Sequence, residues 1–230
     1  MRMRKTAYTV LLVALSVCLL GCTLSGGGQA APDWMWPSEP DVQVDGEGTP
    51  VSAGLTYSTN GDGTCSVQGM GSCKDSELII PPVSPAGDRV VCIEAQAFAG
   101  CTELRSVILP DGLTQIGNAA FSGCDRLASI TVPDSLWHIG EQAFEDCKAL
   151  SEIRLPAAVF YIGEMAFDGC RRLKSVTFER PTGWRGVSGD GEWFEPSGKK
   201  ISIPTEELAD PSGAADALKD TYVYYIWTRS

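Results

Sequence analysis

The chain has 230 residues, of which 43% are hydrophobic, and a formal net charge of −11. This length and hydrophobicity suffice for one domain with a buried core and a tail. The acidic charge and the lack of a long basic run argue against nucleic acid as a partner, because a phosphate backbone requires a basic face. The single histidine, His138, argues against a metal-dependent enzyme.

Residues 1–21 have the parts of an export signal. A basic start precedes an apolar run over residues 10–20, which is too short to predict a transmembrane helix. The run ends in Leu19-Leu20-Gly21-Cys22, which resembles the lipobox of bacterial lipoproteins, where the cysteine after the cut carries a diacylglycerol. We therefore expect a lipid on Cys22, whose acyl chains give stable attachment. The alternative is an ordinary cleaved signal with a cysteine at this place by chance.

Residues 22–54 are expected to form a disordered acidic tether. From Thr23 to Pro50 the chain is rich in Gly, Ser, Pro and acidic residues and contains no Lys or Arg. Low hydrophobicity and charge of one sign do not compensate for the entropy lost on ordering. Such a segment repels itself and links the lipid to the next domain as an extended chain.

Residues 55–91 predict an N-terminal cap for the repeats that follow. Two alternating stretches, 55–57 and 65–67, flank Asn60-Gly61-Asp62-Gly63, which is a strong signal for a hairpin. A degenerate copy of the repeat then ends at Pro81. The terminal units of a repeat protein must be atypical, because they cover an apolar end that would otherwise be exposed.

Residues 92–180 repeat every 23 residues, which predicts a solenoid whose units stack to bury a shared apolar side. Four slots of the repeat are occupied by Phe98, Phe121, Phe144 and Phe167; by Cys101, Cys124, Cys147 and Cys170; by Leu104, Leu127, Leu150 and Leu173; and by Ile93, Ile116, Ile139 and Ile162. Strands of neighbouring repeats lie about 4.8 Å apart, so that equal slots form ladders along the molecule.

One repeat is expected to contain two inward stretches and a reversal. The inward residues of the first full repeat are Leu104, Val107, Leu109, Leu113 and Ile116. Pro110 should end the first strand because it has no N–H for the ladder. Gly117 should then permit a tight reversal into one or two turns of helix that carry Ala120 and Phe121.

The four repeat cysteines, Cys101, Cys124, Cys147 and Cys170, are expected to be structural. Zinc requires a tetrahedral cluster with Zn–S distances of about 2.3 Å, which a straight row of parallel side chains cannot surround. Parallel Cβ directions also disfavour disulfides along the row. The pattern therefore favours small, buried side chains that form weak hydrogen bonds.

Two adjacent slots become aromatic in successive repeats. They are polar in the first full repeat, hold Trp137 and His138 in the next, and hold Phe160 and Tyr161 in the one after. The inward slots of these repeats are already filled, so that part of this set should face solvent, which is typical of interfaces. We predict a ligand-binding patch at these four residues. Cross-strand packing, or cover by the tether or the C-terminal cap, are the alternatives.

Residues 181–230 predict a C-terminal cap. The stretch 201–203 is expected to be a strand, and Asp210-Pro211 predicts the start of a short helix that ends near Lys219. The aromatic residues of this tail are Trp184, Trp193, Phe194, Tyr222, Tyr224, Tyr225 and Trp227. Closing the open end of the solenoid is favoured for them over a platform for carbohydrate.

The sequence contains no serine nucleophile elbow, zinc-binding histidine pair or phosphate-cradling glycine motif. His138 has no acidic residue in its ladder, so no enzyme and no cofactor are expected. The positive residues gather late in the chain, and most should form a solvated face, partly neutralised by pairs such as Asp125 with Lys148. A patch for an anionic ligand is the alternative.

The repeat unit resembles the BspA-like bacterial leucine-rich repeat family. The residues that carry the resemblance are Ile116-Gly117, Ala120-Phe121, Cys124, Leu127, Ile130 and Val132-Pro133, and the segments 62–81 and 210–229 are similar to the usual caps of the family. The resemblance implies an α/β fold, a leucine-rich repeat solenoid of short strands and short helical turns, used at bacterial surfaces for adhesion and recognition. It fixes no ligand.

Cys65 and Cys92 occupy positions where this family normally has other residues. We expect a disulfide between them, because export permits oxidation and closing this loop would contribute about 3 kcal/mol. Two free thiols, or a bond from Cys65 to Cys73, are the alternatives.

The function expected is a binding or adhesion module for protein or glycan ligands at the cell surface. The lipid on Cys22 would hold it to the cell membrane or outer membrane, facing the periplasm or the exterior. The alternative is a structural or assembly component of the envelope without a soluble ligand.

Overall fold

The computed structural model describes residues 48, 50–188, 200–221 and 225–229. The predicted export signal, Cys22 and most of the predicted tether lie outside the described residues. So do Trp193, Phe194, Tyr222 and Tyr224 of the aromatic tail. The chain divides into two units, Met1–Asp41 and Val42–Ser230, and the second contains every residue described below.

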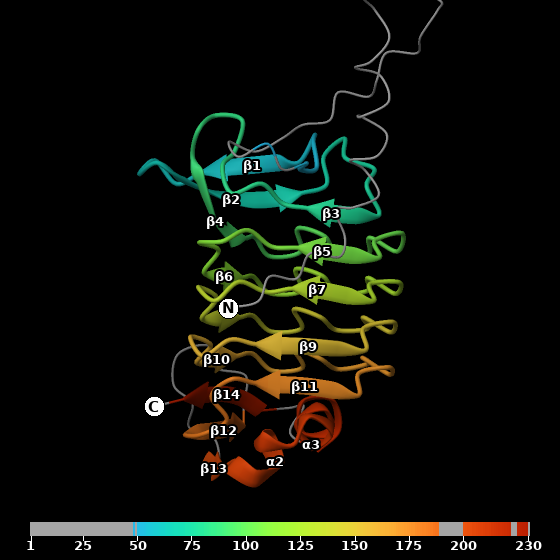
Figure 1. Ribbon diagram of the computed structural model, residues 1–230, viewed down its shortest axis with the longest axis vertical. Coiled ribbons are helices and arrows are strands. Elements are labelled where there is room, and N and C mark those ends of the chain that lie inside the picture. The colour runs from blue at the N-terminus through green and yellow to red at the C-terminus, as the bar shows by residue number, and fades with distance from the viewer. Residues whose placement is uncertain (1–47, 49, 189–199, 222–224, 230) are drawn as a thin grey trace, which may run out of the picture. The chain divides into compact units, whose positions relative to one another are not determined.

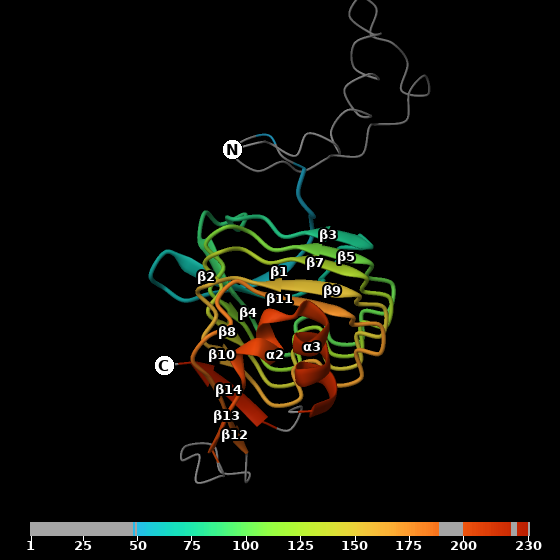
Figure 2. The same ribbon diagram turned by 60° about the horizontal axis from the view of Figure 1, so that its bottom comes forward.

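Successive repeats build two rows of parallel strands on different sides of the coil (Figures 1 and 2). The first row contains β3 (Glu77–Ile79), β5 (Ser106–Ile108), β7 (Ser129–Thr131), β9 (Glu152–Leu155) and β11 (Ser175–Phe178). The second contains β2 (Thr64–Gly69), β4 (Arg89–Ile93), β6 (Gln115–Ile116), β8 (His138–Ile139) and β10 (Tyr161–Ile162). Gln115 pairs with His138, and His138 with Tyr161, so the sheet register repeats the 23-residue period of the sequence.

The predicted inward residues lie in the core. Leu104, Val107, Leu109, Leu113 and Ile116 are all buried. The four phenylalanines form a stack in which the ring centroids of successive residues lie 5.2, 5.5 and 5.2 Å apart. Such aromatic pairs contribute about 0.5–1.5 kcal/mol each beyond the area that they bury. The ladder arrangement predicted from the period is therefore confirmed.

The helical turns predicted inside the repeats are wrong. Residues 118–123 and their equivalents form consecutive turns rather than helix. The N–H groups of Ala119, Phe121 and Gly123 donate to carbonyls of the next repeat, at 2.8 Å each. A helix would direct these N–H groups along its own axis and leave the carbonyls of the next repeat without donors. The stacking of the repeats therefore favours turns whose N–H groups donate to the next repeat.

The tight reversal is made by residues other than glycine. One slot holds Gln96, Ala119, Gln142 and Met165, all in the left-handed region with φ between 53° and 59°. Gly117 was predicted to permit this reversal, but in the structure it has a different role. A Cβ on Gly117 would lie 2.6 Å from the backbone N of Ala95, so this glycine permits the close approach of two repeats.

The hairpin predicted before the repeats is confirmed. β1 (Thr56–Thr59) pairs antiparallel with β2, and β2 then pairs parallel with β4 of the first repeat. The Asp62 side chain accepts hydrogen bonds from the backbone N–H and the hydroxyl of Thr64 within the turn. This pairing extends the second row of strands beyond the repeats.

At the other end, strands and helices from the tail close the stack. β14 (Tyr225–Arg229) pairs antiparallel with both β10 and β12 (Trp184–Ser188), and β13 (Lys200–Ser202) flanks β12. α2 (Thr205–Ala209) and α3 (Pro211–Asp216) pack against β11, as Figure 2 shows. Asp210 caps α3 by accepting the Gly213 N–H at 2.8 Å, as the sequence predicts, whereas α2 was not predicted.

Two tail tryptophans fill the end of the core. Trp184 and Trp227 are 2% and 1% exposed, and their ring centroids lie 6.2 Å apart. Phe178 contacts Trp184 edge-to-face at 5.3 Å. These described aromatics therefore close the core, in the way that the sequence favours over a carbohydrate platform.

The structure contradicts the predicted disulfide between Cys65 and Cys92, because both thiols are free. The pairing register shifts between Cys65 and Ser66, with Cys65 opposite Val90 and Ser66 opposite Cys92. Successive strand residues point to opposite faces, so that Cys65 is buried in the core while Cys92 is half-buried on the outer face. Two side chains on opposite faces of a sheet are poorly placed to form a disulfide bond.

Candidate ligand-binding face

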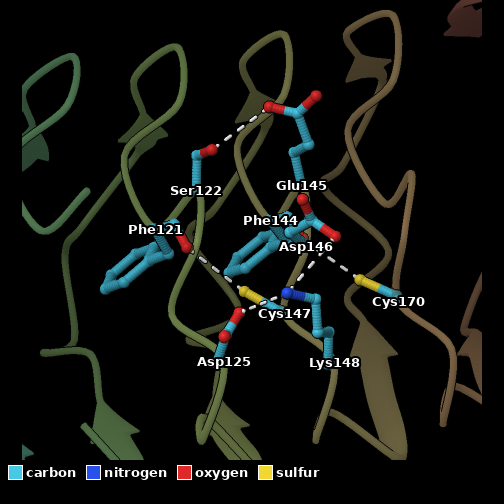
Figure 3. A network of polar contacts seen from close by, with 9 residues as sticks. All are labelled: Phe121, Ser122, Asp125, Phe144, Glu145, Asp146, Cys147, Lys148 and Cys170. Carbon is cyan, nitrogen blue, oxygen red and sulfur yellow. Dashed lines mark hydrogen bonds and ion pairs between the residues drawn. The ribbon is translucent and has the colours of Figure 1, made fainter. Parts of the chain in front are cut away.

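The repeat cysteines bond to the backbone of the preceding repeat. Cys124, Cys147 and Cys170 donate from Sγ to the carbonyls of Phe98, Phe121 and Phe144 at 3.2, 3.2 and 3.1 Å, and Figure 3 shows the last two of these residue pairs. Burial raises the pKa of Cys124 and of Cys170 to about 12, so both thiols keep their proton at neutral pH. Among the described residues, no group of three or more His, Cys, Asp or Glu side chains is placed to hold a metal ion.

Charged side chains also pair along the ladders. Lys148 lies 3.0 Å from Asp125, as predicted, and 3.9 Å from Asp146 (Figure 3). Arg154 bonds to both Asp134 and Glu179. These pairs are partly exposed, so each contributes about 0–1 kcal/mol. Two of the late positive residues are therefore already neutralised by neighbours.

The four predicted ligand-binding residues lie together on the outer side of β8 and β10. The rings of Trp137 and Phe160 stack with centroids 5.0 Å apart and planes at 5°, and those of His138 and Tyr161 stack at 4.5 Å and 6°. Trp137 also meets His138 edge-to-face at 5.4 Å. Phe160 is 43% exposed and the other three are half-buried. We call these four residues the aromatic face.

The polar groups of the aromatic face are neutral at physiological pH. Burial lowers the pKa of His138, and its Nδ1 has no hydrogen-bond partner among the residues that the structure describes. Burial, followed by the charges of Glu141 and Glu164, raises the pKa of Tyr161. The face can therefore stack against a ligand and form hydrogen bonds with it through neutral groups.

Two carboxylates beside the aromatic face were not predicted. Glu141 and Glu164 follow His138 and Tyr161 by three residues and occupy one ladder, in which Asn118 precedes them. Burial and the charge of Glu141 raise the pKa of Glu164. The 23-residue spacing of the two acids was visible in the sequence, but nothing there indicated that they come close to Tyr161.

The C-terminal strand borders the aromatic face without covering it. Tyr161 pairs with Thr228, and the Arg229 N–H donates to the Phe160 carbonyl at 2.9 Å. The Arg229 guanidinium donates to the Ala157 carbonyl at 2.7 Å. Because these contacts involve the backbone around Phe160, its ring keeps its exposure.

Parallel strands that recur every 23 residues around a core of leucine, isoleucine and phenylalanine define a leucine-rich repeat solenoid. Residues 83–183 match the BspA type leucine rich repeat region in 6 copies. The repeat region of the chain belongs to this family.

Solved structures of bacterial leucine-rich repeat proteins resemble the chain. One from Bacteroides capillosus is 28% identical over 55% of this chain and 95% of its own, with a TM-score of 0.50. The T. pallidum protein TpLRR is 28% identical over 54% and 69%, with a TM-score of 0.46. The pneumococcal vaccine antigen PcpA is 29% identical over 51% and 27%, with a TM-score of 0.45. No curated protein sequence matches the chain.

Within the described residues, no helix is long and apolar enough to cross a membrane.

Proposed function

We propose that the protein is a lipid-anchored recognition module that presents its aromatic face to a protein or glycan ligand at the cell surface. The observation that carries this proposal is the stack of half-buried Trp137 on exposed Phe160. The match of residues 83–183 to a leucine-rich repeat family supports it, because solenoid repeats form extended surfaces that are used for binding.

The energetics of the aromatic face favour binding. An exposed phenylalanine ring leaves apolar area in water, and covering such area contributes about 25 cal/mol per Å². The rings of Trp137 and Phe160 are already held by stacking, and their short side chains have few torsions to fix on binding. A ligand would therefore gain contact area at a low entropic cost.

Attachment to the membrane rests on the sequence ending Leu19-Leu20-Gly21-Cys22. The acidic segment after Cys22 would place the solenoid away from the lipid. Intact mass spectrometry of the mature protein should give a chain that starts at Cys22 with acyl mass added. A mature chain without acyl mass would refute the lipid anchor and leave the binding proposal standing.

A capture experiment tests the binding function. The full chain with Cys22→Ser, which prevents lipidation, is compared with the same chain carrying Trp137→Ala and Phe160→Ala. The matched control is Ile108→Ala on the other row of strands, because Ile108 is 44% exposed against 43% for Phe160. We expect the double variant to lose specific ligands and the control to keep them.

If the double variant keeps its ligands and only its melting temperature falls, the aromatic face is packing and the binding site lies elsewhere. Recovery of only the chain itself or its envelope neighbours would favour the structural role instead.

A further inference from the structure

We propose that the aromatic face binds a Lys- or Arg-bearing segment of a partner protein, with Glu141 and Glu164 receiving its positive charges. This inference rests on the proposed function, since it names the class of ligand for the same face. It is carried by the juxtaposition of stacked rings with two carboxylates in consecutive repeats.

The proposed site consists of six residues, arranged as a grid of three slots in each of two consecutive repeats. Trp137, His138 and Glu141 belong to one repeat, and the residues 23 positions later are Phe160, Tyr161 and Glu164. The stacking of both ring pairs shows that the repeats are in register here. Equal slots are therefore about 4.8 Å apart, so that Glu141 and Glu164 occupy neighbouring slots, three residues after the stacked rings of His138 and Tyr161.

The charge of this grid is not balanced within the part of the chain that the structure describes. Arg126 pairs with Glu103, and Arg154 pairs with Glu179, but neither Glu141 nor Glu164 forms an ion pair among the described residues. Burial, and after it the charge of Glu141, raises the pKa of both Tyr161 and Glu164. Two partly buried like charges repel each other, and a cation between them would relieve that repulsion.

The rings favour the same ligand charge. Lys and Arg are attracted to the face of an aromatic ring when they lie within about 6 Å of its centroid, and Arg also stacks on it. A neutral sugar could stack on Phe160 but would leave the carboxylates repelling each other, and an anionic ligand would be repelled by them.

The chain's own tether is a poor occupant of this face. Residues 23–50 contain no Lys or Arg, and they carry Asp33, Glu39, Asp41, Asp45 and Glu47. A chain with a net charge of −11 repels an acidic segment and attracts a basic one. Charge complementarity therefore indicates that the cations come from another protein.

The test measures binding of fluorescein-labelled hexalysine and hexaarginine to the full chain with Cys22→Ser at low ionic strength. Glu164→Gln is compared with Glu152→Gln, which removes the same charge from an exposed position of β9, on the other row of strands. Phe160→Ala is compared with Ile108→Ala. We expect Glu164→Gln and Phe160→Ala each to weaken binding about threefold to tenfold, and the two controls to change it less than about twofold.

Binding should also weaken as salt is added, because ions screen exposed charges. Circular dichroism and urea midpoints show that each variant is folded. Equal losses in Glu152→Gln and Glu164→Gln would overturn the proposal, because the peptides would then be sensing only the overall acidity. Absence of peptide binding, or a preference for hexaglutamate or a neutral oligosaccharide, would overturn it as well.

Two outcomes separate this inference from the function on which it rests. If the Trp137→Ala and Phe160→Ala chain loses its captured ligand while the basic peptides never bind, the face is a binding site for another class of ligand. If Glu164→Gln abolishes a concentration-dependent dimer in sedimentation, the occupant is a second copy of this chain, and the partner proposed here is wrong.

Discussion

Gly140→Ala should destabilise the solenoid by disrupting a close approach between the backbones of two repeats. A Cβ at this position would lie 2.7 Å from the backbone N of Asn118 and 2.7 Å from the carbonyl carbon of Gly117. The Gly140 N–H also donates to the Ile116 carbonyl at 2.8 Å. Overpacking costs about 1–3 kcal/mol and a weakened backbone hydrogen bond about 1 kcal/mol, so that we expect a loss of about 2–4 kcal/mol.

Gly112→Ala is the matched control for this substitution. Gly112 has φ +90°, and no atom lies within 4 Å of an added Cβ, so that only left-handed strain is introduced, at a cost of about 1–2 kcal/mol. Equilibrium urea unfolding followed by circular dichroism and by the fluorescence of the buried Trp184 and Trp227 measures both variants. A larger loss in Gly112→Ala than in Gly140→Ala would refute close approach as the reason for the glycine slot.

Three further substitutions or probes test other parts of the structure. Ala119→Gly should raise the free energy of unfolding by about 1 kcal/mol, because Ala119 has φ 53°; a loss in the same urea assay would contradict the left-handed turn. In the native protein a maleimide should label half-buried Cys92 before buried Cys147, whose pKa burial raises, and mass spectrometry of peptides would detect the reverse order. Burial lowers the pKa of His138 below 6.5, so the unfolded chain binds the proton more readily and stability is lost as pH falls below 6.5. The urea midpoint of His138→Gln should therefore fall less than that of the wild type between about pH 7.5 and about pH 5.5, and equal slopes would contradict this.

The repeat ladders could be predicted because the period alone determines which residues become neighbours. Once strands stack in register, residues 23 apart must touch, so that the stacks of Phe121 on Phe144 and of Trp137 on Phe160 follow directly from the sequence. The same reasoning gave the pair of Lys148 with Asp125. No knowledge of the local backbone is required for these predictions.

The turns could not be predicted from one repeat, because their hydrogen-bond partners lie in the next one. Within a repeat, the Ala120–Phe121 stretch looks compatible with a helical turn. The backbone instead places Ala119 in the left-handed region and sends alternate N–H groups sideways. The stabilisation of this conformation belongs to the stack, so that local propensity gives the wrong answer.

The disulfide prediction failed at a single irregularity in strand pairing. The distance in sequence between Cys65 and Cys92 gives no information on the faces to which their side chains point. A shift of register by one residue moves a side chain to the opposite face of the sheet, and the register shifts between Cys65 and Ser66. Caps depart from the period, so that ladder reasoning does not extend to them.

The outward slots explain why the binding face could be predicted only in part. Inward slots keep the same residue type in every repeat because each must fit against its copies, and only outward slots are free to change. Between the first full repeat and the two that follow, three outward slots change together, from Thr114, Gln115 and Asn118 to aromatic rings, histidine and glutamate.

The aromatic rings could be predicted as a binding patch from the sequence, because large aromatic side chains in outward slots are unusual. The two acids resembled ordinary solvated charges in the sequence. In the fold they lie near enough to Tyr161 that their charge adds to the effect of burial in raising the pKa of the phenol. Changes confined to outward slots and shared by two adjacent repeats leave the scaffold intact, so that the face can be altered by substitution with little cost to the fold.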